Sequence, residues 1–204
     1  MASKTHWERI YRTKDVAEVS WFQEHAAQSI ELIKKTGVSL AAKIIDVGGG
    51  ASTLVDDLVD QGYSEITVLD ISGTALRRSQ HRLGQRASLV TWLELDITRA
   101  ELAHDFYDVW HDRAVFHFLT NETDRAQYVR AVRRSVKTGG HIIVASFGLD
   151  GPEKCSGLNV VRYNAESMHQ EFGNDFKLVD TRTEAHHTPF GPDQQFLYCY
   201  CRKT

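Results

Sequence analysis

The feature that most constrains the fold is a repeated alternation of short apolar runs with segments of helical spacing. Buried strands are predicted at 43–47, 66–70, 89–95, 107–111 and 141–147. Helices are predicted between them at about 53–61, from Ser72 to Gly84, and from Asn121 to Gly139-Gly140. Such an alternation predicts an α/β fold, in which one doubly wound and mostly parallel sheet carries helices on both faces.

Both ends of the chain depart from this alternation. An earlier helix is expected to begin after Ser20, with apolar residues at helical spacing, and to end at Gly37. After a loop over 148–159, a helix is expected at 165–172 and strands at 176–183 and 195–202. Because no helix separates these two strands, they predict an antiparallel hairpin at one edge of the sheet.

Composition excludes several classes of partner. The length of 204 residues suits one domain, and 42% hydrophobic with 25% charged residues is ordinary for a globular protein. The net charge of −3 does not favour nucleic acid or an anionic membrane, and no apolar run approaches the ~18–20 residues of a membrane span. The polar N-terminus and three cysteines without a Cys-x-x-Cys pair predict a cytoplasmic protein with reduced thiols and no metal site.

A glycine-rich turn, Asp46-Val47-Gly48-Gly49-Gly50-Ala51-Ser52, joins the first strand to the next helix. Glycines let the backbone turn sharply and let a ligand lie against it. The dinucleotide fingerprint Gly-x-Gly-x-x-Gly would require glycine where this chain has Thr53. The leading Asp46 would repel a pyrophosphate but suits a cation or an amine, so the turn disfavours NAD and FAD.

Two further acids follow the next two strands. Asp70 lies 22 residues after Gly48, a spacing at which an acid accepts hydrogen bonds from ribose hydroxyls. Asp96 suits an adenine amino group, and Ile97 suits the ring beside it. Each acid alone is readily explained as a helix cap or turn residue. Three acids at the carboxyl ends of consecutive strands instead predict a ligand site at that edge of the sheet.

With these motifs the chain resembles the class I S-adenosylmethionine (SAM)-dependent methyltransferases. The matching stretches are 44–52, 68–72, 95–97, 107–112 and 137–140, and the resemblance covers roughly residues 40–202. It implies a Rossmann-like sheet of seven strands with an antiparallel last strand, SAM as the cofactor and S-adenosylhomocysteine (SAH) as the product. The cofactor-binding residues it predicts are Trp21, Asp46, Gly48, Gly50, Ser52, Asp70, Ile71, Asp96, Ile97 and His111. Ser52 replaces a glycine found in many members.

The subfamily is predicted less directly. The stretch from Trp110 to His117 is similar to thiopurine and tellurite-type small-molecule methyltransferases. The N-terminal His6-Trp7-Glu8 is similar to the opening of small seven-strand lysine methyltransferases, but 112–115 reads Asp-Arg-Ala-Val where those enzymes have Asp-Lys-Gly-Thr. We expect a small-molecule acceptor. The alternatives are a protein (lysine) methyltransferase and a non-catalytic SAM-binding protein.

Catalytic residues are hard to predict, because methyl transfer mainly requires an acceptor held in line, and a base only when the acceptor arrives protonated. Asp112 and His117 follow the fourth strand and are the catalytic candidates. Arg113 and His187 are predicted to contact the acceptor, which suits an anionic group. The competing structural interpretation is that Arg113 forms an ion pair with a nearby acid, His117 is a satisfied half-buried histidine and His187 is exposed.

We expect residues 1–204 to form one methyltransferase domain. It would comprise an N-terminal helical lid at 1–38, a cofactor-binding core at 40–147, and substrate-side loops with the terminal hairpin at 148–204. The lid carries the aromatic residues Trp7, Tyr11, Trp21 and Phe22. They are predicted to close over the cofactor, where an aromatic ring can face the sulfonium, although packing against the domain would also explain them.

Overall fold

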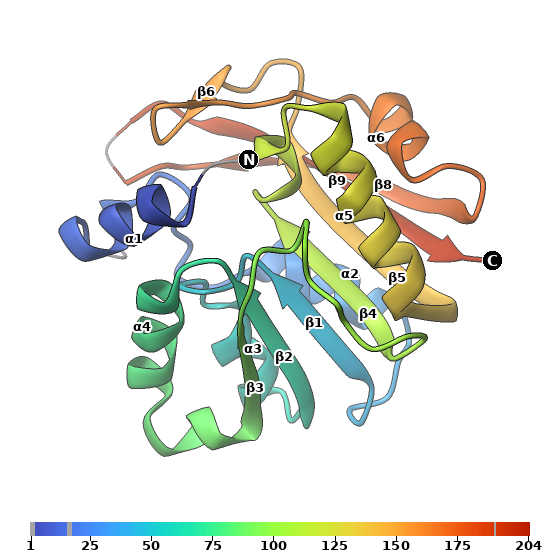
Figure 1. The fold of residues 1–204 in the computed structure, drawn as a ribbon, viewed down its shortest axis with the longest axis horizontal. Coiled ribbons are helices and arrows are strands. Elements are labelled where there is room, and N and C mark those ends of the chain that lie inside the picture. The colour runs from blue at the N-terminus through green and yellow to red at the C-terminus, as the bar shows by residue number, and fades with distance from the viewer. Residues whose placement is uncertain (1–2, 16–17, 190) are drawn as a thin grey trace.

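The computed structural model describes residues 3–15, 18–189 and 191–204. In this part of the chain, seven strands form one sheet in the order β3-β2-β1-β4-β5-β9-β8 (Figure 1). Their bounds are β1 Lys43–Val47, β2 Glu65–Asp70, β3 Val90–Glu94, β4 Tyr107–Arg113, β5 Val136–Phe147, β8 Phe176–His186 and β9 Gln194–Lys203. The pairings among β1 to β5 are parallel, and β9 is antiparallel to both β5 and β8. The predicted fold class is confirmed.

Helices cover both faces of this sheet. Their bounds are α1 Lys4–Thr13, α2 Ala27–Lys35, α3 Leu54–Asp60, α4 Gly73–Leu83, α5 Glu122–Ser135 and α6 Ala165–Phe172, with short 3-10 helices at η2 Gly84–Leu89 and η3 Phe116–Phe118. One apolar cluster includes side chains of α2, α3 and α4, and a second includes those of α5 and α6. The strand order changes direction between β1 and β4, and in such sheets ligands bind at this point, beyond the carboxyl ends of the strands.

The predicted caps at Ser72, Gly84 and Asn121 are confirmed. The Ser72 side chain accepts a hydrogen bond from the amide of Ala75 at the start of α4, and Gly84 follows the last residue of that helix. The Asn121 side chain accepts from the amide of Asp124 at the start of α5. These side chains satisfy amides that have no partner within the helix, so they fix where each helix begins.

The N-terminal segment differs from the prediction. The helix expected after Ser20 begins at Ala27, and a separate helix, α1, precedes it. Side chains outside the segment hold the intervening backbone: His186 contacts the carbonyl of Ser20, and Arg113 donates to the carbonyl of Trp21. These contacts keep residues 20–23 irregular even though their apolar spacing is helical.

The prediction that Gly139 and Gly140 end a helix is wrong. Helix α5 ends at Ser135, and β5 begins at Val136. The carbonyls of Arg134 and Ser135 accept hydrogen bonds from the amides of Asp105 and Phe106, so the chain turns away from the helix there. The predicted loop over 148–159 also contains a small antiparallel pair, β6 Lys154–Cys155 with β7 Leu158–Asn159.

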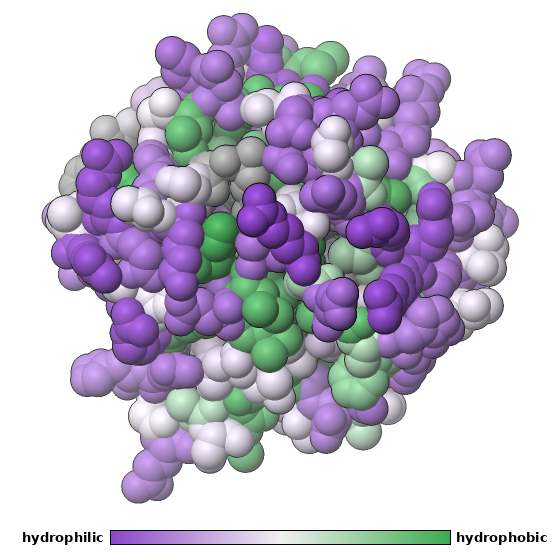
Figure 2. All heavy atoms as spheres, in the orientation of Figure 1, coloured by the Kyte–Doolittle hydropathy of each residue, from purple (hydrophilic) through white to green (hydrophobic). Residues whose placement is uncertain are grey.

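The visible surface is mostly polar. On the face drawn in Figure 2, hydrophilic side chains predominate, and hydrophobic ones gather near its middle, over the sheet between α4 and α5. Among the residues that the structure describes, no helix is long and apolar enough to span a membrane. The same residues contain no group of three or more side chains placed to hold a metal ion.

Candidate functional site

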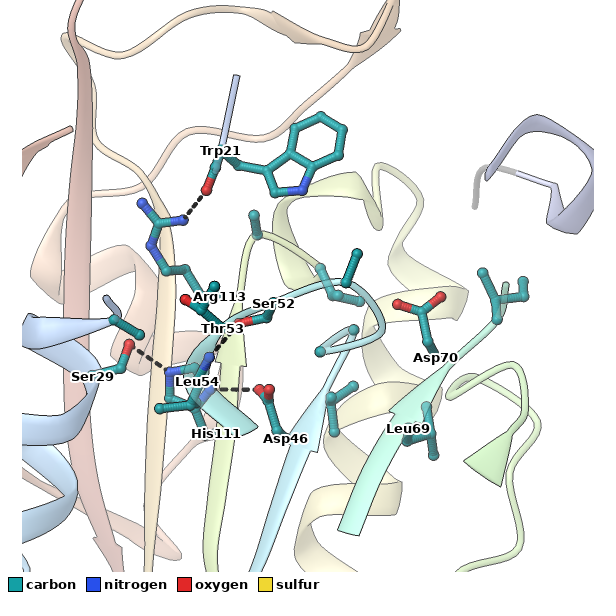
Figure 3. A pocket seen from close by; sticks show the side chains of 18 of the residues that line it. Trp21, Ser29, Asp46, Ser52, Thr53, Leu54, Leu69, Asp70, His111 and Arg113 are labelled. Atoms are coloured by element: carbon teal, nitrogen blue, oxygen red, sulfur yellow. Dashed lines mark hydrogen bonds and ion pairs between the residues drawn. The ribbon is translucent and has the colours of Figure 1, made fainter. Parts of the chain in front are cut away.

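A pocket lies beyond the carboxyl ends of β1, β2 and β4 (Figure 3). The glycine turn and the strand ends form its floor, and α1 with residues 19–23 forms its outer wall. Of the predicted cofactor-binding residues, the pocket lining includes Trp21, Asp46, Gly48, Ser52, Asp70, Ile71, Ile97 and His111. Gly50 and Asp96 are not among the lining residues.

The glycine turn needs its glycines for two different reasons. Gly48 has a φ of +74°, a conformation that side chains disfavour, and a Cβ there would collide with Val115. A Cβ on Gly49 would collide with the Asp46 carboxylate. The turn can therefore lie this close to Val115 and Asp46 only because Gly48 and Gly49 have no side chains, and both glycines line the pocket.

Asp46 lies in the floor of the pocket and is only 2% exposed. Its Oδ1 is 2.7 Å from Nδ1 of His111, and Nε2 of His111 is 2.9 Å from Oγ of Ser29. The other oxygen, Oδ2, is buried and has no hydrogen-bond partner among the described residues. A buried acceptor without a partner costs about 1–3 kcal/mol, so this atom marks a place for a donor from a ligand.

Asp70, at the end of β2, is also buried in the pocket wall. Its two carboxylate oxygens accept hydrogen bonds from the amides of Ser72 at 2.8 Å and Gly50 at 3.0 Å. Burial raises the pKa of Asp70 to about 6, although the two amides and their hydrogen bonds oppose that shift. Each oxygen of the ionised carboxylate can accept one more hydrogen bond, which suits a pair of neighbouring hydroxyls. Gly50 therefore supports Asp70 and does not itself line the pocket.

The third predicted acid has a different position. Ile97 is buried and lines the pocket together with Leu95, as expected for residues that pack against a flat ring. Asp96 accepts hydrogen bonds from the amide and the hydroxyl of Thr98, at 3.0 and 2.7 Å. Its predicted contact with adenine stays a prediction.

Four aromatic side chains of the N-terminal segment line the pocket: Trp7, Tyr11, Trp21 and Phe22. The rings of Trp7 and Trp21 meet edge to face, with centroids 5.9 Å apart. Glu8 holds α1 in place, because its carboxylate accepts hydrogen bonds from Ser72 and Thr74 at the start of α4. Partial burial opposes ionisation of Glu8, but these hydrogen bonds outweigh it and lower its pKa to about 2.

Arg113 connects the pocket wall to the terminal hairpin. It donates to the Trp21 carbonyl at 3.0 Å and to the Tyr198 hydroxyl at 3.0 Å, and it pairs with Glu184 at 3.4 Å. The guanidinium also lies 4.0 Å from the centre of the Phe196 ring. It lines the pocket, but its hydrogen-bonding groups serve the protein's own structure, so its contact with an acceptor stays a prediction.

The other catalytic and substrate candidates lie outside the pocket lining. Asp112 is fully buried on the face that α5 covers, where it accepts from the Tyr128 hydroxyl and the amides of Val115 and Phe116. Burial raises its pKa to about 7. This environment is that of a structural acid and gives no support to catalysis.

The two histidine candidates are also set apart from the lining. His117 is fully buried; burial, and then Arg113, lower its pKa to about 3, so the ring is neutral near pH 7. His187 is exposed, and its Nδ1 lies 2.7 Å from Asp193. Neither position supports the predicted role in catalysis or acceptor binding.

The residues of the site that were not predicted from the sequence include Ser29, Glu8, Glu184 and Phe118. Ser29 is a small polar residue on the inward face of α2, where the apolar residues Ile30 and Ile33 dominate the pattern. Glu184 contacts Gln23, 161 positions earlier in the chain. Only Ser29 could have been found from the sequence, because it is a polar residue at an inward position of a helix.

Comparisons with known proteins find similarity to methyltransferases. A family model described as a methyltransferase domain matches residues 45–144. The chain is 26% identical over 171 residues to a Danio rerio eEF1A lysine and N-terminal methyltransferase, covering 82% of this chain and 24% of the relative. It is 21% identical over 194 residues to Homo sapiens EEF1A lysine methyltransferase 2, covering 88% of this chain and 76% of the relative. The chain thus spans about a quarter of the length of the zebrafish relative.

Solved structures share the fold over nearly the whole chain. A structure titled as the conversion of a disulfide bond into a thioacetal group during echinomycin biosynthesis superposes with a TM-score of 0.80 at 14% identity, covering 98% of this chain and 92% of that one. The N-methyltransferase NodS of Bradyrhizobium japonicum in complex with SAH has a TM-score of 0.75 at 16% identity and covers 99% of both chains.

Proposed function

We propose that this chain is a class I SAM-dependent methyltransferase, and that its acceptor is an amino group, first of all the ε-amino group of a lysine in a protein. The observation that carries this proposal is the similarity to lysine methyltransferases over most of this chain. Fold neighbours at 14–16% identity do not discriminate between acceptors.

The residues present fit SAM. The unpartnered Oδ2 of Asp46 suits a cationic amino group, Asp70 suits the ribose hydroxyls, and Leu95 with Ile97 suits the adenine ring. When bound, SAM supplies a methyl group on a positively charged sulfur, which is already activated for transfer. The protein must then orient the acceptor within about 3–3.5 Å of the methyl carbon and exclude water.

The apolar outer wall favours an amine acceptor. Trp7, Trp21 and Phe118 lie close together, with Trp7 and Phe118 ring centroids 5.0 Å apart, and all three line the pocket. Such rings accommodate the aliphatic stem of lysine. Apolar surroundings also disfavour the ammonium form, so they release the neutral amine that attacks, and its proton passes to solvent.

A small-molecule acceptor is the second candidate. The observation that favours it is the outer wall itself, since Glu8, Arg113 and His186 each tie the N-terminal segment to the rest of the protein. A wall held at several points suits an acceptor small enough to enter whole. Non-catalytic SAM binding is the remaining alternative.

A transfer assay with isotopically labelled SAM tests these candidates. The protein would be incubated separately with cell protein and with the low-molecular-mass fraction of the same extract, and an Asp46→Ala variant would serve as the inactive control. We expect label in protein that appears as methyl-lysine after hydrolysis. Label confined to the small molecules would transfer the assignment to the second candidate. Absence of label in both fractions, with SAM binding intact, would contradict both.

A further inference from the structure

A buried line of three polar side chains, Asp46, His111 and Ser29, crosses the floor of the pocket (Figure 3). Their exposed fractions are 2%, 2% and 0%. All three line the pocket, yet only Asp46 and His111 lie on the strands that form the binding edge.

The sheet register explains why the first two meet. Asp46 on β1 and His111 on β4 are directly paired across adjacent parallel strands, so their side chains emerge on the same face. Ser29 comes from α2, which covers this face and places its hydroxyl against the far side of the imidazole. The three residues thus come from three separate elements.

The hydrogen-bond directions follow from the chemistry of the groups. The Asp46 carboxylate only accepts, so Nδ1 of His111 carries a hydrogen and donates it. Nε2 is then left to accept the hydrogen bond that the Ser29 hydroxyl donates. Asp46 therefore fixes the tautomer of His111, Ser29 anchors the far side of the ring, and His111 holds one oxygen of Asp46.

The second oxygen of Asp46 is what this arrangement leaves available. Oδ2 has no partner among the described residues, and the neighbouring Gly49 has no Cβ to cover it. Rotation of the carboxylate plane by a quarter turn would break the contact with His111 and move the free oxygen from its present position. The line thus determines which oxygen faces a ligand.

We propose that His111 and Ser29 are positioning residues that hold the Asp46 carboxylate with Oδ2 toward the amino group of SAM and SAH. His111 and Ser29 therefore contribute to the affinity only of ligands that carry this cationic amino group. The proposed role of His111 and Ser29 depends on SAM binding and not on the identity of the acceptor. It therefore applies to whichever acceptor the transfer assay identifies.

Calorimetric titration with two ligands tests this proposal. One ligand is SAH, and the other is deamino-SAH, in which hydrogen replaces the amino group. His111→Leu should weaken SAH binding by about tenfold or more and deamino-SAH binding by less than about twofold. Ser29→Ala should act in the same selective way, by about three- to fivefold, because His111 remains but is no longer anchored.

A conservative variant separates positioning from folding. In His111→Asn the amide nitrogen takes the place of Nδ1, so SAH affinity should recover to within about threefold of the wild type. His141→Leu is the matched control, since His141 hydrogen-bonds Tyr200 and does not line the pocket. It should leave both affinities unchanged.

Three results would overturn the proposal. The first is an equal loss of both ligands in His111→Leu, which would mean that His111 only maintains the shape of the pocket. The second is unchanged SAH binding in that variant. The third is a folded His111→Asn that binds SAH no better than His111→Leu. If His111→Leu fails to fold, His111→Asn and Ser29→Ala are compared instead. The deciding quantity is again the loss of SAH affinity relative to the loss of deamino-SAH affinity.

Discussion

Asp70 carries two hydrogen bonds from backbone amides before any ligand arrives, and burial still raises its pKa to about 6. The ionised carboxylate accepts from ribose hydroxyls better than the protonated acid does. Protonation of this one residue therefore opposes cofactor binding. The stability of the fold depends on pH in the opposite way to cofactor binding. Because burial raises the pKa of Asp70 in the folded state, its protonated form favours folding at low pH, and this contribution is lost as the pH rises through 6.

We predict that SAH affinity is constant above about pH 7 and falls by up to about tenfold per pH unit below about pH 6. Asp70→Asn should bind SAH at least about tenfold more weakly at pH 8, since hydrogen bonds to a charged acceptor contribute about 1.5–3 kcal/mol each. Its affinity should be nearly independent of pH in this range. Calorimetry from pH 5 to 8 measures both. A wild-type affinity that stays constant down to pH 5 would contradict the assignment.

The sequence predicts a pocket residue correctly where its position at the end of a strand is enough to place it at the site. Asp46 and Asp70 were predicted because each follows an apolar run, and both line the pocket. Asp112 shows the limit, because neighbours on a strand point to opposite faces. His111 and Arg113 face the pocket, and Asp112 faces α5. The alternation was readable from the sequence, but which face holds the ligand was not.

At the scale of elements, the strands and capped helices of the core were predictable, since apolar spacing and cap residues are local signals. The N-terminal segment was not, because distant contacts decide its shape. The carbonyls of Ser20 and Trp21 are held by His186 and Arg113, and Glu8 of α1 contacts Thr74 of α4. No local pattern encodes partners so far away in the chain.

The Glu8 carboxylate accepts hydrogen bonds from Ser72 and Thr74 and so ties helix α1 to the start of α4. We therefore predict that Glu8→Ala releases α1. Hydrogen exchange of the α1 amides should accelerate, and SAH affinity should fall by about three- to tenfold because the outer wall loses Trp7 and Tyr11. The thermal unfolding midpoint of the sheet should change little. Arg9→Ala, on the same helix but exposed, is the control. Unaltered exchange in Glu8→Ala would show that other contacts hold the helix.

For the whole molecule, the face that α5 covers contains a buried polar chain. Trp110 donates to the Tyr128 hydroxyl at 2.9 Å, and Tyr128 donates to Asp112 at 2.6 Å. Asp112 receives two further hydrogen bonds from the backbone where β4 leads into η3. This chain links the central strand to the helix above it, and it lies on the opposite face of the sheet from His111.

We predict that Tyr128→Phe lowers the free energy of unfolding by about 1–3 kcal/mol, because the buried Asp112 loses a donor and Trp110 loses an acceptor. Methyl transfer and SAH affinity should stay within about twofold of the wild type, since none of these three residues lines the pocket. Denaturant unfolding and calorimetry measure the two effects. A large loss of transfer without loss of stability would restore Asp112 as a catalytic residue.

The attachment of the N-terminal segment also has a consequence for biosynthesis. Ser20, Trp21 and Gln23 are made early, whereas the residues that hold them, Arg113, Glu184 and His186, are made up to 166 positions later. At about 5–20 residues per second, the ribosome leaves the outer wall without its last partners for roughly ten seconds or more. A nascent chain can thus pair its first five strands while its cofactor site is still incomplete, and the pocket closes only when the terminal hairpin has been synthesised.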